Sequence, residues 1–245
     1  MSARRSMPTK PDAVILCGGA GSRLRTVTGD NPKSMATIGH RPFLELLLRQ
    51  LSRHQWKRVV LAVGYREDAI RRHFGKQAFG LEIVYSSEPK PLGTAGALRN
   101  ALDCMESEAV LVMNGDSYTD VDLGQVFTEY HRDSAEVSLV LIPLNGRSDC
   151  GSVLVDADGN VKEFQEKTTH PDLEYANAGI YVIARKLIAD IPPGKPVSIE
   201  HEVFPRWLRE GKRMRAFLSQ SSCMDIGTPE RYQNAQDTLS DAERR

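Results

Sequence analysis

Residues 13–33, AVILCGGAGSRLRTVTGDNPK, contain the groups best suited to bind phosphate. The apolar run at 13–17 predicts a short buried strand, and glycines follow it directly. Because glycines leave backbone N–H groups uncovered, a phosphate can approach the main chain there. The residues that would hold it through N–H groups, a hydroxyl or positive charge are Gly18, Gly19, Gly21, Ser22, Arg23 and Lys33. The stretch predicts a nucleoside triphosphate site, and we expect Ser22 to cap a helical turn whose N-terminus adds to it.

The glycines by themselves do not match the common nucleotide-binding motifs. Leu24 stands where a dinucleotide fingerprint that includes Gly19 and Gly21 needs its third glycine. A Walker A loop needs a Lys-Ser or Lys-Thr pair directly after its last glycine, which this sequence lacks. A tight strand-to-helix turn beside solvated Arg23 and Arg25 is therefore the alternative interpretation.

Two aspartates are candidates for holding a metal ion against those phosphates. Asp116 follows the apolar strand predicted at 109–113, and ligands of α/β proteins bind at the carboxyl ends of such strands. Asp225 lies in the segment MDIGTP, ahead of the last predicted helix. Mg²⁺ commonly takes one or two protein carboxylates plus substrate phosphates, so the pair fits Mg²⁺ if the fold brings the two together. The alternative for each aspartate is a role in forming a turn.

The segment 87–96, SEPKPLGTAG, offers a surface over which a base and a ribose could lie. Within it, Glu88 can only accept hydrogen bonds, whereas guanine presents adjacent donors at N1 and N2. An amide side chain would instead suit uracil or thymine, which present a donor beside an acceptor. Glu88 therefore favours guanine, and an exposed loop glutamate is the alternative.

The glycine loop, residues 18–21, is followed by Ser22-Arg23-Leu24 and, further on, by Asn31-Pro32-Lys33. Together these residues resemble the signature of sugar-1-phosphate nucleotidyltransferases, which is Gly-Gly-x-Gly-Thr-Arg-Leu followed by Pro-Lys-Pro. Ser22 replaces the threonine and keeps its hydroxyl, and Ser34 replaces the second proline. Neither change removes a charge that the chemistry needs. The resemblance extends over nearly the whole chain, from residue 13 to about residue 232.

The resemblance implies a role for each candidate residue. The catalytic residues would be Arg23, Lys33 and Asp116, and the ligands of Mg²⁺ would be Asp116 and Asp225. The nucleotide would be bound by Gly18, Gly19, Gly21, Ser22, Glu88, Gly93 and Thr94. The sugar 1-phosphate would be bound by Glu166, Lys167, Asn177 and Gly179. Taken alone, Glu166-Lys167 would be a solvated surface pair and Asn177 the start of an ordinary strand.

The implied reaction is in-line attack of a sugar-1-phosphate oxygen on the α-phosphorus of a nucleoside triphosphate, which releases pyrophosphate. Positioning and charge neutralisation dominate this type of catalysis. Within the family, the start Leu16-Cys17-Gly18-Gly19 and the lack of a C-terminal extension resemble the compact D-glycero-D-manno-heptose 1-phosphate guanylyltransferases, which use GTP. Similar compact enzymes use mannose 1-phosphate with GTP, or N-acetylmuramate 1-phosphate with UTP, and these remain alternatives.

Two other classes of function stay open. The motif Asp120-Val121-Asp122 is the Asp-x-Asp of a metal-dependent glycosyltransferase, although the glycine loop with Arg23 and Lys33 suits a triphosphate better than a diphosphate-sugar. A non-catalytic nucleotide-sensing module would bind without turnover. It is disfavoured because no charge expected of the active site is missing.

The pattern of apolar residues predicts an α/β fold: a Rossmann-like mixed, mostly parallel sheet flanked by helices, with a smaller strand-rich sugar-binding lobe. In the first half, strands at 13–17, 58–63, 81–85 and 109–113 alternate with helices at 42–55, 67–74 and 94–104. In the second half we expect strands at 137–143, 152–155, 161–166 and 178–183, a hairpin turn at 156–160, and helices at 198–209 and 230–239. We expect one domain over residues 1–245, with the nucleotide-binding part at about 10–125 and the sugar-binding part at about 126–240.

The composition excludes several classes of partner. The chain has 32 Lys and Arg against 32 Asp and Glu, which argues against nucleic acid or an anionic membrane as the main partner. No apolar run approaches the ~20 residues that span a bilayer, and the polar N-terminus does not match a signal peptide. The scattered cysteines predict reduced thiols in a cytoplasmic protein. The expected partners are the nucleotide and the sugar 1-phosphate, and the oligomeric state, a homo-oligomer included, stays open.

Overall fold

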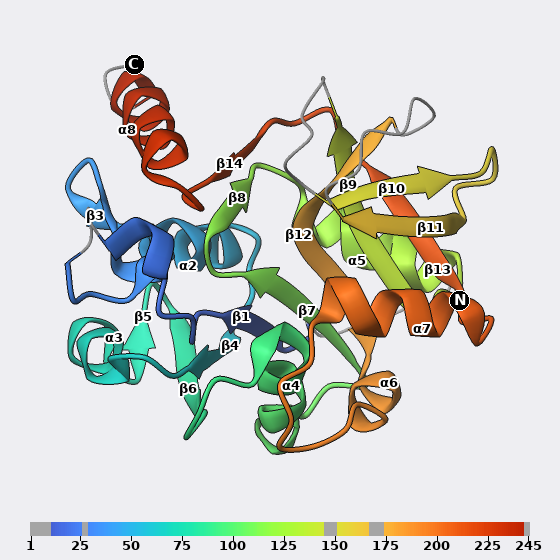
Figure 1. The fold of residues 1–245 in the computed structure, drawn as a ribbon, viewed down its shortest axis with the longest axis horizontal. Helices are drawn as coiled ribbons and strands as arrows, with labels where there is room; N and C mark the ends of the chain where they lie inside the picture. Colours follow the sequence, from blue (N-terminus) through green and yellow to red (C-terminus); the bar gives the residue numbers. More distant parts are fainter. Residues whose placement is uncertain (1–10, 26–28, 145–150, 167–173, 243–245) are drawn as a thin grey trace, which may run out of the picture.

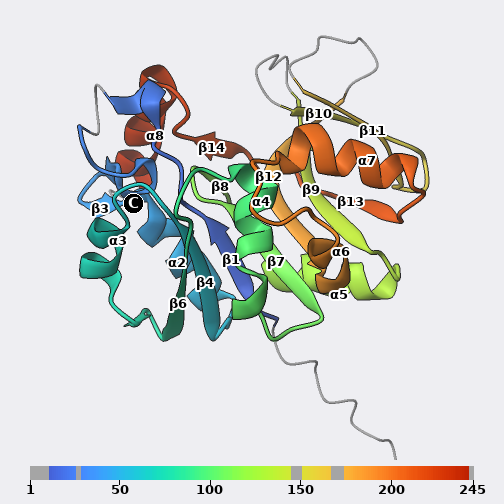
Figure 2. The same ribbon diagram turned by 60° about the horizontal axis from the view of Figure 1, so that its bottom comes forward.

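Four parallel strands form the centre of the sheet. The computed structural model describes residues 11–25, 29–144, 151–166 and 174–242, the side chains of 165, 166 and 239–242 excepted. The central order is β7 (Ala109–Asn114), β1 (Ala13–Leu16), β4 (Arg58–Val63) and β6 (Leu81–Ser87). Adjacent pairs are all parallel, so their carboxyl ends meet at one edge, as Figure 2 shows. The short β5 (Gln77–Ala78) pairs antiparallel with β6 at the outer edge.

The strand-rich second half continues the same ten-stranded sheet. β12 (Tyr175–Ala184) pairs antiparallel with β7 and thereby joins the two halves. Beyond it lie β9 (Val137–Pro143), β10 (Gly151–Val155), β11 (Val161–Glu166) and β13 (Met214–Leu218). The hairpin turn expected at 156–160 joins β10 and β11: Gly159 has φ +81°, and an Asp156 oxygen accepts the N–H of Asp158. The predicted fold class, a mixed sheet with mostly parallel central strands, is confirmed.

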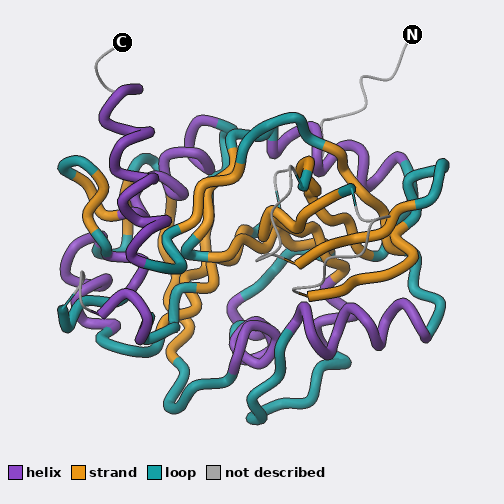
Figure 3. Tube along the Cα trace, turned by 45° about the horizontal axis from the view of Figure 1, so that its top comes forward, coloured by secondary structure: helices purple, strands orange, loops and turns teal. Residues whose placement is uncertain are grey.

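Helices cover both faces of the sheet (Figures 1 and 3). Each face has its own hydrophobic core. Strand residues alternate between the faces, so Ala13 and Ile15 of β1 belong to one core while Val14 belongs to the other. The first face is covered by α2 (Phe43–Arg53), α3 (Glu67–Phe74), α5 (Leu123–Arg132) and α8 (Pro229–Ala242). The second face is covered by α4 (Gly93–Asn100), α6 (Arg185–Ala189) and α7 (Phe204–Arg209). Because helices bury both faces of the sheet, the central strands carry apolar side chains on both sides, as the apolar runs of the first half predict.

Several elements differ from the sequence prediction. Helix α5 was not expected, although Asp122 precedes an apolar pattern and accepts the N–H groups of Gly124 and Gln125 as its N-cap. The helix expected at 94–104 is divided into α4 and a 3₁₀ turn, Leu102–Cys104. Strand β13, helix α6 and five short strands were also missed: β2 (Thr37–Ile38), β3 (Arg41–Pro42), β5, β8 (Ser117–Thr119) and β14 (Cys223–Asp225).

Three cysteines lie among the described residues, and all three are free thiols: Cys17, Cys104 and Cys223. Burial raises the pKa of the Cys17 thiol, and the nearby Glu88 carboxylate raises it further, so this thiol is held in its unreactive protonated form. Cys150 lies outside the described residues. Within the described ranges, no helix combines the length and the apolar character needed to cross a membrane.

Candidate active site

A cleft of about 1220 Å³ opens where the central parallel strands end. Its floor includes Cys17 after β1, Gly64 after β4, Glu88 after β6 and Asn114 at the end of β7. The predicted site residues that line it are Gly18, Gly19, Arg23, Lys33, Glu88, Gly93, Thr94, Asp116, Asn177, Gly179 and Asp225. Residues predicted from segments as far apart as 18 and 225 therefore share one cavity. Of the other predictions, Lys167 and the side chain of Glu166, at the end of β11, lie outside the described residues.

The glycine loop turns into a 3₁₀ helix, Ser22–Leu24, but Ser22 does not cap it. The N-cap position belongs to Gly21, which has φ +59°, and the turn has no side-chain cap. This prediction was wrong because a glycine in the left-handed conformation starts the turn one residue earlier. A Cβ at Gly21 would lie 2.6 Å from the Cβ of Lys33, so Gly21 makes room for Lys33. Neither Gly21 nor Ser22 is among the residues that line the cleft.

Lys33 and Asp116 form an ion pair inside the cleft. The Nζ of Lys33 donates to Oδ2 of Asp116 at 2.5 Å, and the two side chains are 15% and 42% exposed. Lys33 comes from a 3₁₀ turn, Lys33–Met35, and Asp116 from the turn between β7 and β8. A Cβ at the neighbouring Gly115 would lie 2.5 Å from the carbonyl oxygen of Leu16, so the turn needs glycine there. The chain thus brings a fixed cation and a carboxylate into contact at the carboxyl end of β7.

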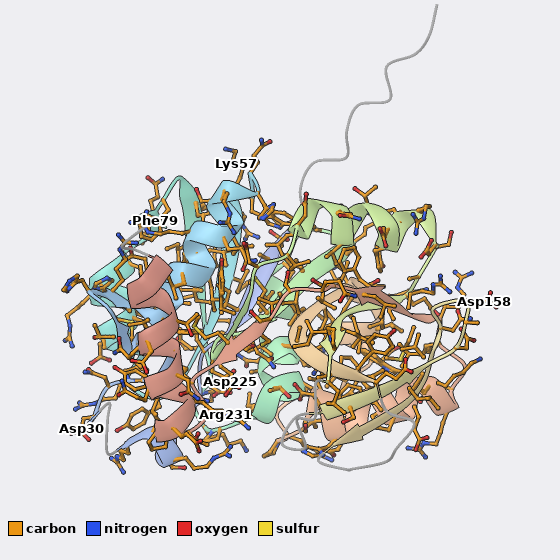
Figure 4. All side chains as sticks on the ribbon, turned by 90° about the horizontal axis from the view of Figure 1, so that it is seen from above. Asp30, Lys57, Phe79, Asp158, Asp225 and Arg231 are labelled. Carbon is orange, nitrogen blue, oxygen red and sulfur yellow. The ribbon has the colours of Figure 1, made fainter. Side chains whose placement is uncertain are left out.

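Asp225 lies beside Asp116 because β14, which ends at Asp225, pairs with β8, which begins directly after Asp116. β14 runs antiparallel to β8, and the N–H of Ile226 donates to the carbonyl oxygen of Asp116 at 3.0 Å. Oδ1 of Asp225 accepts from the N–H of Gly227 and from Nη1 of Arg231, both at 2.9 Å. Figure 4 shows the labelled Asp225 and Arg231 next to each other. The two predicted carboxylates therefore converge, which the sequence alone could not establish.

The Asp-x-Asp motif does not contribute to the cleft. Asp120 pairs with Arg53 on the surface, Asp122 caps α5, and neither lines the cavity. The structure thus removes the motif on which the glycosyltransferase alternative depended.

Glu88 lies beside the glycine loop, so it is not a freely exposed loop glutamate. A Cβ at Gly18 would lie 2.5 Å from its Oε1, and one at Gly64 would lie 2.7 Å from the same oxygen. Oε2 accepts the N–H of Leu92 at 3.1 Å. Burial raises the pKa of Glu88, and the bond from Leu92 only partly offsets this rise. The sequence analysis missed Gly64, although it directly follows a predicted strand.

Gly93 and Thr94 begin α4 and hold the chain segment before α7. Gly93 has φ +66°, and a Cβ there would lie 2.6 Å from the carbonyl oxygen of Val197. The Thr94 hydroxyl accepts the N–H of Ile199 at 2.8 Å and donates to Glu200 at 3.1 Å. Both residues line the cleft, but the Thr94 hydroxyl already has partners within the protein.

Glu200 is the cleft residue that the sequence analysis most clearly missed. Its Oε1 accepts from the Tyr181 hydroxyl at 3.2 Å and from Nδ2 of Asn114 at 3.4 Å. It lies in a π-helical turn, Ile199–Val203, where a regular helix was expected from 198 to 209. Pro205 has no N–H for the carbonyl four residues earlier, which suits a wider turn at this point. A polar network from β7, β12 and α4 therefore meets at Glu200.

Asn177 and Gly179 form a bulge in β12, where the pairing register with β9 shifts. Nδ2 of Asn177 donates to the Tyr181 hydroxyl at 2.7 Å, and its Oδ1 accepts the N–H of Gly179 at 3.0 Å. Burial is the main cause that raises the pKa of Tyr181, so its hydroxyl stays protonated. Gly179 has φ +73°, and a Cβ there would lie 2.8 Å from Oγ of Ser117. The bulge thus brings β12 close to the strand that follows Asp116.

Comparison with known proteins identifies the family of the chain. Residues 12–242 match the family described as "Nucleotidyl transferase". A solved structure from Bacillus anthracis, 22% identical, shares the fold with a TM-score of 0.84 over 94% of this chain. The chain belongs to the nucleotidyl transferase family and is a nucleotidyltransferase, as the resemblance of its glycine loop predicted.

Other similar proteins carry more specific names. The chain is 36% identical over 223 residues to "Mannose-1-phosphate guanylyltransferase" of Mycobacterium tuberculosis, covering 90% of this chain and 62% of that protein. It is 33% identical to "D-glycero-alpha-D-manno-heptose 1-phosphate guanylyltransferase" of Aneurinibacillus thermoaerophilus, covering 93% of this chain and 98% of that one. The crystal structure of HddC from Yersinia pseudotuberculosis complexed with GMP-PN has 30% identity and a TM-score of 0.80, covering 94% of this chain and all of that one.

Proposed function

We propose that the protein transfers GMP from GTP to a sugar 1-phosphate, D-glycero-D-manno-heptose 1-phosphate, to give the GDP-sugar and pyrophosphate. The observation that carries this proposal is the convergence of Lys33, Asp116 and Asp225 in the cleft that also contains Glu88. Heptose is favoured because the chain covers 98% and 96% of two heptose 1-phosphate guanylyltransferases, at 33% and 34% identity. Mannose 1-phosphate is the second candidate because of the mycobacterial relative, of which the chain covers 62%.

The nucleotide-binding part of the chain would position the triphosphate and supply positive charge. The backbone at Gly18 and Gly19, together with Arg23 and Lys33, would hold the triphosphate and stabilise the leaving pyrophosphate. Each charge-assisted contact to a phosphate contributes roughly 1.5–3 kcal/mol. Because the transferred nucleotidyl group needs little covalent assistance from the protein, these contacts would supply most of the catalysis.

The donor set fits Mg²⁺. Asp116, in the turn before β8, and Asp225, at the end of the paired strand β14, offer carboxylate oxygens, the ligand type that Mg²⁺ prefers. Among the described residues there is no cluster of three or more His, Cys, Asp or Glu that could hold a metal without help, so substrate phosphates would complete the coordination. Bound there, Mg²⁺ would neutralise charge on the phosphates.

The second half would bind the sugar 1-phosphate. Asn177 and Gly179 line the cleft on the side of β12, and Glu166 ends β11, which β10 separates from β12 in the sheet. With Lys167, these residues would bind the sugar hydroxyls and the sugar's phosphate, so that about 126–240 forms the sugar-binding part and about 10–125 the nucleotide-binding part. A nucleotide-sugar synthesis of this kind would take place in the cytoplasm.

A substrate panel tests the proposal. Four nucleoside triphosphates would be combined with heptose, mannose and N-acetylmuramate 1-phosphates, and pyrophosphate release would be measured. We expect the highest kcat/KM with GTP and the heptose substrate. Highest activity with mannose 1-phosphate, or with UTP and N-acetylmuramate 1-phosphate, would select those alternatives. Nucleotide binding without pyrophosphate from any pair would favour a nucleotide-sensing module.

Glu88→Gln is expected to lower kcat/KM for GTP about 10- to 100-fold. The new amide keeps an acceptor for the N–H of Leu92 but places a donor against the donors of guanine. Inosine triphosphate lacks the N2 amine, so the preference for GTP over it should shrink in the variant. Glu82→Gln, an exposed glutamate on the same strand, is the matched control. An unchanged GTP-to-ITP ratio in Glu88→Gln would contradict the assignment to guanine.

The same contact predicts a pH dependence. The ionised carboxylate accepts from guanine, and burial raises the pKa of Glu88 above its usual 4.5. As the pH falls through this raised pKa, Glu88 takes up a proton and the preference for GTP should decline. In Glu88→Gln the GTP-to-ITP ratio should not change with pH over that range.

A further inference from the structure

We propose that Arg231 is a further residue of the active site, which neutralises Asp225 in the nucleotide-free protein and binds the triphosphate once a nucleotide is present. Its guanidinium lies 2.9 Å from Oδ1 of Asp225, and both residues line the cleft. The consequence is that nucleotide and divalent cation bind cooperatively. The nucleotide part of this inference rests on the proposed function, whereas the metal part does not.

Two ion pairs lie side by side in the cleft. Lys33 pairs with Asp116, and Arg231 pairs with Asp225. A Cβ at Gly227 would lie 3.0 Å from Oδ1 of Asp225, 3.3 Å from Nη1 of Arg231 and 3.8 Å from Nζ of Lys33. Two cations and the Asp225 carboxylate therefore lie around this glycine, and Asp116 contacts one of the cations, so the formal charges of the four groups cancel.

These two cations would compete with a metal ion for the carboxylates of Asp116 and Asp225. Both carboxylates are the candidate ligands, and each already accepts from a positively charged side chain. The side chains of Arg231 and Asp225 are 26% and 16% exposed, so water screens the pair only partly. A divalent cation that approaches must displace a guanidinium and an ammonium or be repelled by them.

The Arg231 side chain can turn towards a phosphate while its helix stays in place. The start of α8 is bound to the β2–β3 hairpin through Tyr232 and Gln236, which donate to the carbonyl oxygen of Thr37 at 2.5 and 2.6 Å. The N–H of Gly39 in that hairpin also donates to Gln236 at 2.8 Å. The planar guanidinium of arginine matches phosphate oxygens in a bidentate geometry. A triphosphate in the cleft would therefore draw Arg231 away from Asp225 and leave the carboxylate to the metal.

Binding of Mn²⁺ tests the proposal without turnover. Electron paramagnetic resonance would measure Mn²⁺ affinity for the full-length wild type, Arg231→Met and Arg231→Lys, with and without the α,β-methylene analogue of GTP. Without nucleotide, Arg231→Met should bind Mn²⁺ about 3- to 10-fold more tightly than the wild type, because no guanidinium competes. Arg231→Lys should stay near the wild type. The analogue should bind Arg231→Met about tenfold more weakly and increase its Mn²⁺ affinity less than in the wild type.

The control is Arg132→Met, which removes an exposed arginine paired with Glu129 and Asp133 at the end of α5, outside the cleft. It should bind Mn²⁺ and the analogue as the wild type does. Weaker Mn²⁺ binding by Arg231→Met without nucleotide would overturn the proposal, because Arg231 would then orient the metal ligand. Unchanged Mn²⁺ binding in that variant would overturn it as well. If Mn²⁺ binding tightens as expected but the analogue binds no form of the protein, the proposed use of GTP is overturned while the competition at Asp225 stands.

Discussion

Lys33→Ala is expected to lower kcat about 10²- to 10³-fold, the loss typical for a preorganised electrostatic donor. Lys33 is only 15% exposed, and its Nζ is held 2.5 Å from Asp116 in the cleft. Removing it takes away a cation that would stabilise the leaving pyrophosphate, and it leaves Asp116 without this partner. Asp116→Asn should cost a similar factor, because the amide cannot supply a charged metal ligand.

The losses of kcat in Lys33→Ala and Asp116→Asn should not add in the double variant. Since Lys33 and Asp116 contact each other directly, the double variant is expected to be about as slow as the slower single variant. Rates of pyrophosphate release at saturating substrates measure this. Lys57→Ala, which removes an exposed lysine that does not line the cleft, should leave kcat unchanged (Figure 4). A normal rate in Lys33→Ala would remove that residue from the mechanism.

The second large effect concerns stability. Asp12→Ala is expected to lower the free energy of unfolding by about 3–5 kcal/mol, the range for removing one partner of a buried ion pair. Asp12 is 4% exposed at the start of β1 and accepts from Nη1 of Arg58 at 2.5 Å. Its other oxygen accepts the N–H groups of Glu106 and Ser107 at 2.5 and 2.9 Å. Alanine would leave those donors and the Arg58 charge without this acceptor.

The contribution of Asp12 should depend on pH in a definite direction. Burial alone would raise its pKa, but the bonds from Glu106, Ser107 and Arg58 outweigh burial and lower the pKa below 3.8. A carboxyl with a lowered folded-state pKa stabilises the protein above its unfolded pKa and loses that contribution as the pH falls through the folded one. Urea unfolding at several pH values below 7 should therefore show a steeper acid loss in the wild type than in Asp12→Ala.

A matched aspartate separates this effect from a general loss of charge. Asp158→Ala, in the exposed β10–β11 turn, should change the free energy of unfolding by less than about 0.5 kcal/mol. If Asp12→Ala costs no more than Asp158→Ala, the buried pair contributes no net stability.

The elements predicted well from the sequence are those whose signal is local. The strands at 58–63 and 137–143 and the helix at 67–74 have the predicted bounds, since each is a short apolar or amphipathic run with clear ends. Helix α5 has a local signal, its N-cap at Asp122. The same aspartate also fits the Asp-x-Asp metal motif, and for this reason the helix was missed. The π-helical turn had no comparable signal. It depends on Pro205 and on the bonds from Thr94, 105 residues away from Ile199.

The sequence by itself determined the class of this protein. A glycine loop after a strand, followed by Arg23 and Lys33, specifies chemistry through residue types and short spacing, which need no tertiary contact to recognise. Only the tertiary structure decided which groups meet: Asp225 beside Asp116, Arg231 on Asp225, and Glu200 between Thr94 and Tyr181. These contacts join segments that are far apart in the chain, and strand pairing and helix packing bring them together, which no local pattern encodes.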